Sequence, residues 1–190
     1  MEIHAPEKPI LTVKEAIAEA RDNISAELRD NRADLRTVRG KMDGMLKKLA
    51  EAADTVDGLS SQWNESTGTA FFATPGPKYV MYNYDLTTLS TSSYTTAQTT
   101  GALSFMDYSE VKRYAHIYEL QEMFVRQQTQ SADAAQTAAA LGLGLVKKPT
   151  PADFDVVKRQ LRVAAGELLF DQGYADVLLK TYDRALNEIK

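Results

Sequence analysis

Among the residue types that can take part in chemistry, tyrosine is the most strongly clustered in this sequence. Seven of the nine tyrosines lie between residues 79 and 118. A phenol ring offers a large apolar surface with one hydrogen-bonding group at its tip, which suits a pocket for a ligand or a partner protein. The same ring also suits the end of a helical bundle, where its hydroxyl reaches water. With both interpretations open, the candidates for ligand or partner contact are Tyr82, Tyr84, Tyr94, Tyr114 and Tyr118.

Metal and nucleophile chemistry find little support in the residue types present. With two histidines and no cysteine, thiolate catalysis, disulfides and cysteine-ligated zinc are excluded. His116 stands one helical turn before Glu119, but a dinuclear carboxylate site in a bundle needs Glu-x-x-His motifs on two helices. Neither the G-x-S-x-G turn of hydrolases nor a glycine-rich phosphate loop occurs. The sequence therefore predicts no metal site, no cofactor and no enzymatic activity.

Composition favours a single globular domain and excludes some partner classes. The chain has 190 residues, of which 44% are apolar and 25% charged, an ordinary balance for one domain. The net charge of −4 comes without a basic stripe, so nucleic acid is not an expected partner. No apolar run is long enough to span a membrane, and the first twelve residues lack the apolar core of a signal peptide.

A first long helix is predicted from about Val13 to Val56. Thr12 and Glu15 form a capping box at its start. Apolar residues then recur at steps of three and four, a pattern that helices bury against other helices. We expect Gly40 and Gly44 to bend this helix more than break it. Asn31 lies on the apolar face. It either sets the helix register or contacts a ligand; alternatively, it lies at the edge of the face and bonds a polar neighbour.

Two more helices are predicted in the second half of the chain. Asp107 and Glu110 resemble a capping box, and the pattern that follows runs to the glycines at 142 and 144. Thr150 then caps a last helix with Pro151 at its first position. Its buried face is expected to carry Phe154, Val157, Leu161, Ala164 and Leu168, and its pattern continues to the C-terminus.

The segment between the first two long helices, residues 58–106, reads as an insertion. Its first part combines aromatic residues with a turn at residues 74–77. Its second part is rich in Ser and Thr and has no charge between Asp85 and Asp107. A short helix at about 91–104 is expected there, with Gly101 as a close-contact residue, because a solvated linker usually carries charge. A flexible linker is the alternative, since Ser and Thr are mediocre helix formers.

The sequence as a whole predicts an all-α protein. We expect residues 1–11 to form an extended lead-in and residues 12–190 to form one domain. This domain is a bundle of three long antiparallel helices, with a short helix and the irregular, aromatic-rich insertion between the first and second.

Two stretches, residues 26–35 and 94–118, resemble a loose group of small bacterial single-pass membrane proteins of unknown function. The shared positions are Glu27, Leu28, Asn31, Arg32, Tyr94, Thr100, Gly101, Ala102, Leu103, Tyr114, Ala115, Ile117 and Tyr118. Two features depart from that group: Tyr94 stands where Trp is more usual, and no transmembrane helix precedes the first long helix. The resemblance implies the soluble part of a longer protein, anchored by a missing N-terminal helix and facing the periplasm.

The expected function is binding without catalysis. The first hypothesis is a helical domain at the periplasmic face of the bacterial inner membrane, or otherwise in the cytoplasm, that senses or binds a protein partner. The second is a bundle that binds a small ligand in a tyrosine-rich pocket. Long apolar faces can pair between chains as well as within one, so we expect a monomer or a weak homodimer.

Overall fold

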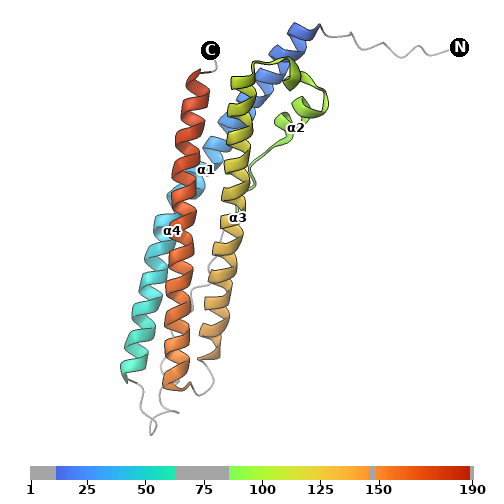
Figure 1. Ribbon diagram of the computed structural model, residues 1–190. Coiled ribbons are helices and arrows are strands. Elements are labelled where there is room, and N and C mark those ends of the chain that lie inside the picture. The colour runs from blue at the N-terminus through green and yellow to red at the C-terminus, as the bar shows by residue number, and fades with distance from the viewer. Residues whose placement is uncertain (1–11, 63–85, 146–148, 189–190) are drawn as a thin grey trace, which may run out of the picture.

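The structure is a computed structural model that describes residues 12–62, 86–145 and 149–188. Its elements are α1 (Val13–Gln62), α2 (Ser92–Thr99), the short 3-10 helix η3 (Ala102–Phe105), α3 (Tyr108–Gly144) and α4 (Pro151–Glu188) (Figure 1). No strand occurs in these ranges, so the predicted all-α class and helical bundle are confirmed. The lead-in and the aromatic part of the insertion lie outside the described residues.

Helix α1 is continuous over its 50 residues, a length of about 75 Å at 1.5 Å per residue. The capping box closes as predicted: the Glu15 amide donates to the Thr12 hydroxyl at 3.3 Å, and the Thr12 amide donates to the Glu15 carboxylate at 2.8 Å. Gly40 and Gly44 lie within the helix without interrupting it. The predicted continuity of the first helix is therefore confirmed, and the helix ends six residues later than expected, at Gln62.

Helix α4 is the element around which the bundle packs, since it lies along both α1 and α3. Its inner face buries residues at alternating steps of three and four, from Phe154 to Ala185. The apolar residues of α1 that are buried in the core are spaced four or seven positions apart. They are Ile24, Leu28, Leu35, Met42, Leu49 and Val56. Full burial of each such side chain stabilises the fold by about 1.5–3 kcal/mol, so these two faces hold the length of the bundle together.

The directions of the three long helices differ from the antiparallel arrangement that the sequence predicted. In the contacts between α1 and α3 the residue numbers rise together, as in the pairs Arg21–Glu110 and Glu27–Tyr118. In the contacts between α1 and α4 they run in opposite senses, as in Arg39–Asp176 and Asp57–Lys158. Helices α1 and α3 are thus parallel, and only α4 is antiparallel to both (Figure 1). The physical reason is the insertion, because α2 and η3 pack beside α1 and start α3 at the same end.

An extended segment, residues 86–91, lies between the parallel helices and is held by two side-chain amides. The Asn31 side chain of α1 donates to the Ser90 carbonyl at 2.8 Å and accepts from the Ser90 amide at 2.8 Å. The Gln128 side chain of α3 does the same to Thr87, at 3.2 Å and 3.0 Å. Residues three apart in an extended chain direct their backbone groups to opposite edges. We call this arrangement the amide clamp, since α1 holds one edge of the segment and α3 the other.

The serine- and threonine-rich stretch is helical, but it forms two short helices where one was predicted. Thr99 and Thr100 donate their hydroxyls to the carbonyls of Thr95 and Thr96, at 3.0 Å and 2.9 Å. This back-bonding satisfies hydroxyls that would otherwise compete for water. Helix α2 then ends, and η3 begins after Gly101.

Gly101 corrects a second prediction. A Cβ atom added to it would meet no heavy atom within 4 Å, so it is not a close-contact residue. Its φ is +77°, in the left-handed region, where residues with a Cβ are strained and glycine is not. Gly101 is therefore required for the backbone conformation that separates α2 from η3.

The amide clamp makes Asn31→Ala a destabilising change. The substitution removes the buried Asn31 amide and leaves the partly buried amide and carbonyl of Ser90 without their partner, so we expect a loss of about 1–3 kcal/mol of unfolding free energy. Asn23→Ala is the matched control, because Asn23 is an exposed residue of the same helix and should change stability by no more than about 0.5 kcal/mol. Urea melts of both variants measure the difference, and equal midpoints would show that the clamp is not stabilising.

Candidate functional site

Three of the five candidate tyrosines gather at the end of the bundle where α2 packs. The rings of Tyr94 on α2 and Tyr118 on α3 are stacked, with centroids 4.3 Å apart and planes at 13°. Tyr114 precedes Tyr118 by one turn of α3, and both are buried. Tyr82 and Tyr84 lie outside the described residues. The structure thus brings Tyr94 and Tyr118 together, and it buries Tyr114 one turn earlier on α3.

Glu27 is a buried carboxylate at the centre of this cluster. One of its oxygens accepts from the Tyr118 hydroxyl at 2.6 Å. The other accepts from the hydroxyls of Ser90 and Ser92 and from the Ser93 amide, at 2.8, 2.9 and 2.8 Å. No Lys or Arg among the described residues forms an ion pair with Glu27. Four hydrogen bonds from neutral donors therefore take the place of water and of a counter-ion.

The position of Glu27 makes it the N-terminal cap of α2. The residue before α2, Thr91, makes no side-chain capping bond, and the Ser93 amide in the first turn donates to Glu27 instead. Burial by itself raises the pKa of Glu27, but the Ser93 amide and the hydroxyls of Tyr118, Ser90 and Ser92 lower it below its ordinary value. The positive end of the α2 dipole favours the same ionised form.

A second carboxylate, Glu110 on α3, joins the same two long helices about two turns of α3 before Tyr118. Arg21 of α1 donates to both of its oxygens, at 2.7 and 2.6 Å, and Tyr114 donates to one of them at 3.1 Å. The Arg21 bonds lower the pKa of Glu110 more than its burial raises it. Glu110 was expected to close a capping box with Asp107; its carboxylate turns inward to this pair instead.

The chemistry of the cluster is that of a closed hydrogen-bond network. Burial raises the pKa of the Tyr118 hydroxyl, and its bond to Glu27 raises it further. Burial raises the pKa of Tyr114 in the same way, followed by the charge of Glu110. The tyrosines are thus held protonated as donors while the carboxylates are held ionised as acceptors. Because these bonds join α2, α1 and α3 to one another, the network fixes the position of the α2 excursion.

Sequence reasoning identified the tyrosines but not the carboxylates that they bind. Glu27 lies between Ile24 and Asn31 at helical steps of three and four, so the sequence places it on the apolar face of the first helix. An acidic residue at such a position is seldom buried without partners. That signal indicates a buried carboxylate with hydrogen-bond partners, although the sequence does not show which distant residues supply the donors.

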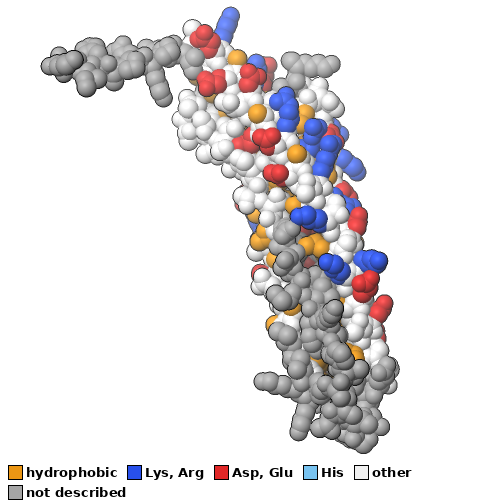
Figure 2. Space-filling model, turned by 180° about the vertical axis from the view of Figure 1, so that it is seen from behind, with side chains coloured by type: hydrophobic (Ala, Val, Ile, Leu, Met, Phe, Trp, Pro, Cys, Tyr) orange, Lys and Arg blue, Asp and Glu red, His pale blue; other side chains and the backbone are white. Residues whose placement is uncertain are grey.

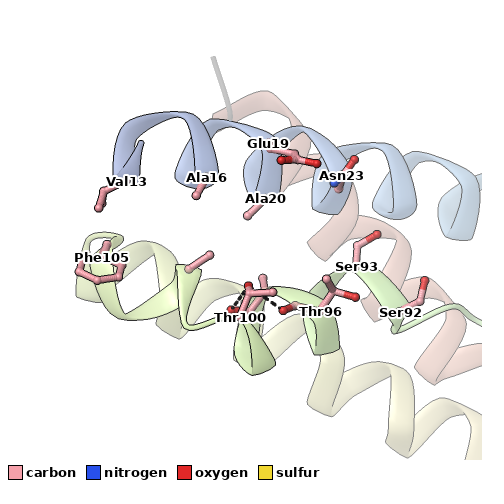
Figure 3. Close-up of a pocket in the computed structure, with 12 residues that line it drawn as sticks. Val13, Ala16, Glu19, Ala20, Asn23, Ser92, Ser93, Thr96, Thr100 and Phe105 are labelled. Carbon is pink, nitrogen blue, oxygen red and sulfur yellow. Dashed lines mark hydrogen bonds between the residues drawn. The ribbon is translucent and has the colours of Figure 1, made fainter. Parts of the chain in front are cut away.

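A pocket of about 390 Å³ lies between the first turns of α1 and the α2–η3 excursion. Figure 3 shows Val13, Ala16 and Ala20 of α1 opposite Phe105, Thr96 and Thr100. Toward its other end the lining is polar and comes from Glu19, Asn23, Ser92 and Ser93. None of the candidate tyrosines lines this pocket, so it is distinct from the tyrosine-rich pocket expected from the sequence.

The outer face of α4 carries an apolar stripe that the sequence analysis missed. Val156, Val163, Phe170 and Val177 follow one another at steps of seven residues and are between 44% and 66% exposed. Leu169 lies exposed beside them. On the same face are Gly166 and Gly173, around which there is open space. We call the four spaced residues the α4 stripe; their seven-residue period was readable from the sequence beside that of the buried face.

The part of the chain that the structure describes holds neither a metal-binding cluster nor a helix that could span a membrane. No three His, Asp or Glu side chains there converge as metal ligands. His116 lies 3.9 Å from the Glu119 carboxylate, and both are exposed. None of the described helices is both long and apolar enough to cross a membrane.

Comparison with known proteins finds no relatives. The chain matches no protein family, no curated protein and no solved structure.

The hydrogen bonds of Glu27 make Glu27→Gln destabilising at neutral pH. An amide side chain can accept at one atom only, so at least one buried donor loses its partner, and we expect a loss of about 2 kcal/mol or more. Glu122→Gln is the control, because Glu122 forms an exposed pair with Arg126 that contributes at most about 0.5 kcal/mol.

The two changes should also differ in their response to acid. The pKa of Glu27 in the folded state lies below its ordinary value of 4.5, so its contribution is fully present above that pH and is lost as the pH falls further. Urea melts between pH 7 and pH 3 should therefore show a shallower acid loss for Glu27→Gln than for the wild type. An equally steep loss in both would mean that Glu27 is not the stabilising carboxylate.

Proposed function

We propose that this chain is a non-enzymatic interaction domain that binds a protein partner through the outer face of α4. The α4 stripe is the observation that supports it. Helix α4 already buries one face against α1 and α3, and the α4 stripe is a second apolar row that stays exposed on its outer face. Exposed apolar residues are normal when scattered, whereas a contiguous patch of them marks an interaction site.

The spacing of the stripe favours a helical partner. Seven residues is the repeat of a coiled-coil seam, in which another helix packs with interlocking side chains; the stripe supplies one large apolar residue per repeat, and Arg159, Gly166 and Gly173 lie between them. Beside the stripe, Gly166 and Gly173 leave room for the backbone of a partner to approach. Phe170 near the middle of the stripe is the kind of aromatic anchor that contributes most to binding energy in protein interfaces.

The distribution of charge also supports a protein partner. On the face of the molecule that Figure 2 shows, Lys and Arg side chains lie among Asp and Glu side chains. With a net charge of −4, such a surface lacks the single-sign field that attracts nucleic acid.

The cellular setting is proposed from the resemblance alone. If the chain is the soluble part of a bacterial single-pass membrane protein, the bundle faces the periplasm and is held at the inner membrane by a preceding helix. An apolar run of about 20 residues encoded upstream of Met1 is the observation that this setting requires.

Photo-crosslinking tests the proposed interaction face. We expect benzoylphenylalanine placed at Phe170 to form a protein adduct in cells of the source organism, because this side chain lies in the middle of the interface. The same amino acid at Tyr108, which is more exposed than Phe170 but lies on α3, is the control and should form none. No adduct at Phe170, or adducts of the same mass at both positions, would reject the α4 stripe as a binding face.

A second candidate function is the binding of a small ligand, and the pocket between α1 and α2 favours it. Its volume of about 390 Å³ lies at the lower end of the range for ligand sites. Its apolar end suits a short hydrocarbon or aromatic group, and its polar end, with the Glu19 carboxylate and several hydroxyls, suits a hydrogen-bonding or cationic head.

Native mass spectrometry of the purified protein tests this second function. A bound small molecule should be lost when Ala20→Phe fills the pocket, while Ala33→Phe, at an exposed position of the same helix, should keep it. A ligand that survives Ala20→Phe, or no ligand in the wild type, would remove this pocket from consideration.

A further inference from the structure

We propose that the partner of the α4 stripe is a second copy of this chain, docked with the two α4 helices side by side and antiparallel. This inference rests on the proposed function, because it takes the stripe to be an interaction face. It adds the identity of the partner and the symmetry of the complex.

The period of the stripe determines how two such helices meet. An α-helix has 3.6 residues per turn, so a seven-residue repeat drifts by about 20° per step. Two helices keep such stripes in contact only by winding around each other with a left-handed supercoil. A straight, flat surface is therefore a poorer fit than another helix that carries the same repeat.

The positions of the stripe residues match a two-fold axis between Gly166 and Glu167. With the helices antiparallel about this point, Val163 lies opposite Phe170 of the second copy, and Val156 lies opposite Val177. Every large residue of the stripe then faces another from the same stripe, as a self-complementary two-fold interface requires. Gly166 lies next to the axis, where the absence of a side chain lets the two backbones approach.

The charges beside the stripe favour the antiparallel over the parallel arrangement. Asp155 lies at the start of α4 and Lys180 near its end, and both are exposed. Antiparallel docking places Asp155, which also pairs with Lys158 of its own helix, near Lys180 of the second copy. Parallel docking places each charge next to its own copy instead, and like charges at that distance repel.

The size of the stripe predicts a weak dimer. From Val156 to Val177 the helix is about 32 Å long at 1.5 Å per residue. One helix face of that length is smaller than the roughly 800 Å² per partner of a standard stable interface. We therefore expect dissociation in the micromolar range or above.

Sedimentation over a range of concentrations tests the self-association. The wild type should shift from monomer toward dimer between about 1 and 500 µM. Phe170→Glu should raise the dissociation constant at least tenfold, because it places a charge in the apolar contact of each copy. Tyr108→Glu is the control and should sediment as the wild type does. A wild type that stays monomeric, or a dimer that Phe170→Glu leaves unchanged, would overturn the proposal.

Single cysteines test the geometry, since the chain has none of its own. Gly166→Cys should form a disulfide-linked dimer on mild oxidation, because the axis brings position 166 of both copies together. Val156→Cys should not, because the two copies of position 156 lie about 30 Å apart in the antiparallel arrangement, far beyond the 4.4–6.8 Å that a disulfide spans between Cα atoms. Efficient crosslinking at 156 and not at 166 would refute the antiparallel dimer.

The crosslinking at Phe170 separates failure of this inference from failure of the proposed function. An adduct with a second copy of the chain supports both. An adduct with a different protein, together with monomeric sedimentation, overturns the second copy and leaves the interaction face in place. No adduct together with monomeric sedimentation rejects both.

Discussion

The structure depends on how an extended piece of backbone is accommodated between two parallel helices. Residues 86–90 make no helical hydrogen bonds, and a backbone amide or carbonyl that packs against the helices without a partner costs up to about 1–3 kcal/mol. The amide clamp solves this problem with side chains: Asn31 and Gln128 each present one donor and one acceptor in the spacing of a neighbouring strand. The clamp thus takes the place of a β-sheet in a protein made of helices, and it explains why polar residues interrupt the apolar faces of α1 and α3.

As a consequence, most of the apolar packing in the bundle involves α4. Helices α1 and α3 are separated by the extended segment at one end, where Glu27 and Glu110 link them through hydrogen bonds. Helix α4 contacts both over most of its length and buries an aromatic or aliphatic residue at nearly every turn. The bundle therefore has two kinds of interface: a mainly apolar one around α4, and a polar one in which α2 and the extended segment are held between α1 and α3.

Periodicity in the sequence predicted the elements better than their arrangement. The long helices follow from apolar steps of three and four, and the Thr12–Glu15 capping box forms as expected, because both depend only on residues close in sequence. The direction of α3 depends on where the insertion returns, which no local pattern encodes. Gly101 was assigned to a close contact because spacing alone cannot reveal a positive φ. Glu27 and Gln128 were overlooked as partners because their donors and acceptors come from residues more than 40 positions away.

The parallel relation of α1 and α3 also shapes the route by which the chain reaches its fold. Contacts between α3 and α4 join residues as little as 26 positions apart, as in Gln160 with the Ala134 carbonyl. Contacts between α1 and α4 join residues up to 151 apart, as in Arg32 with Asp183. Closing the longer loop costs about 1.5 kcal/mol more in chain entropy. The α3–α4 hairpin is therefore the local unit of the topology, and α1 is the element whose docking carries the high contact order that slows folding.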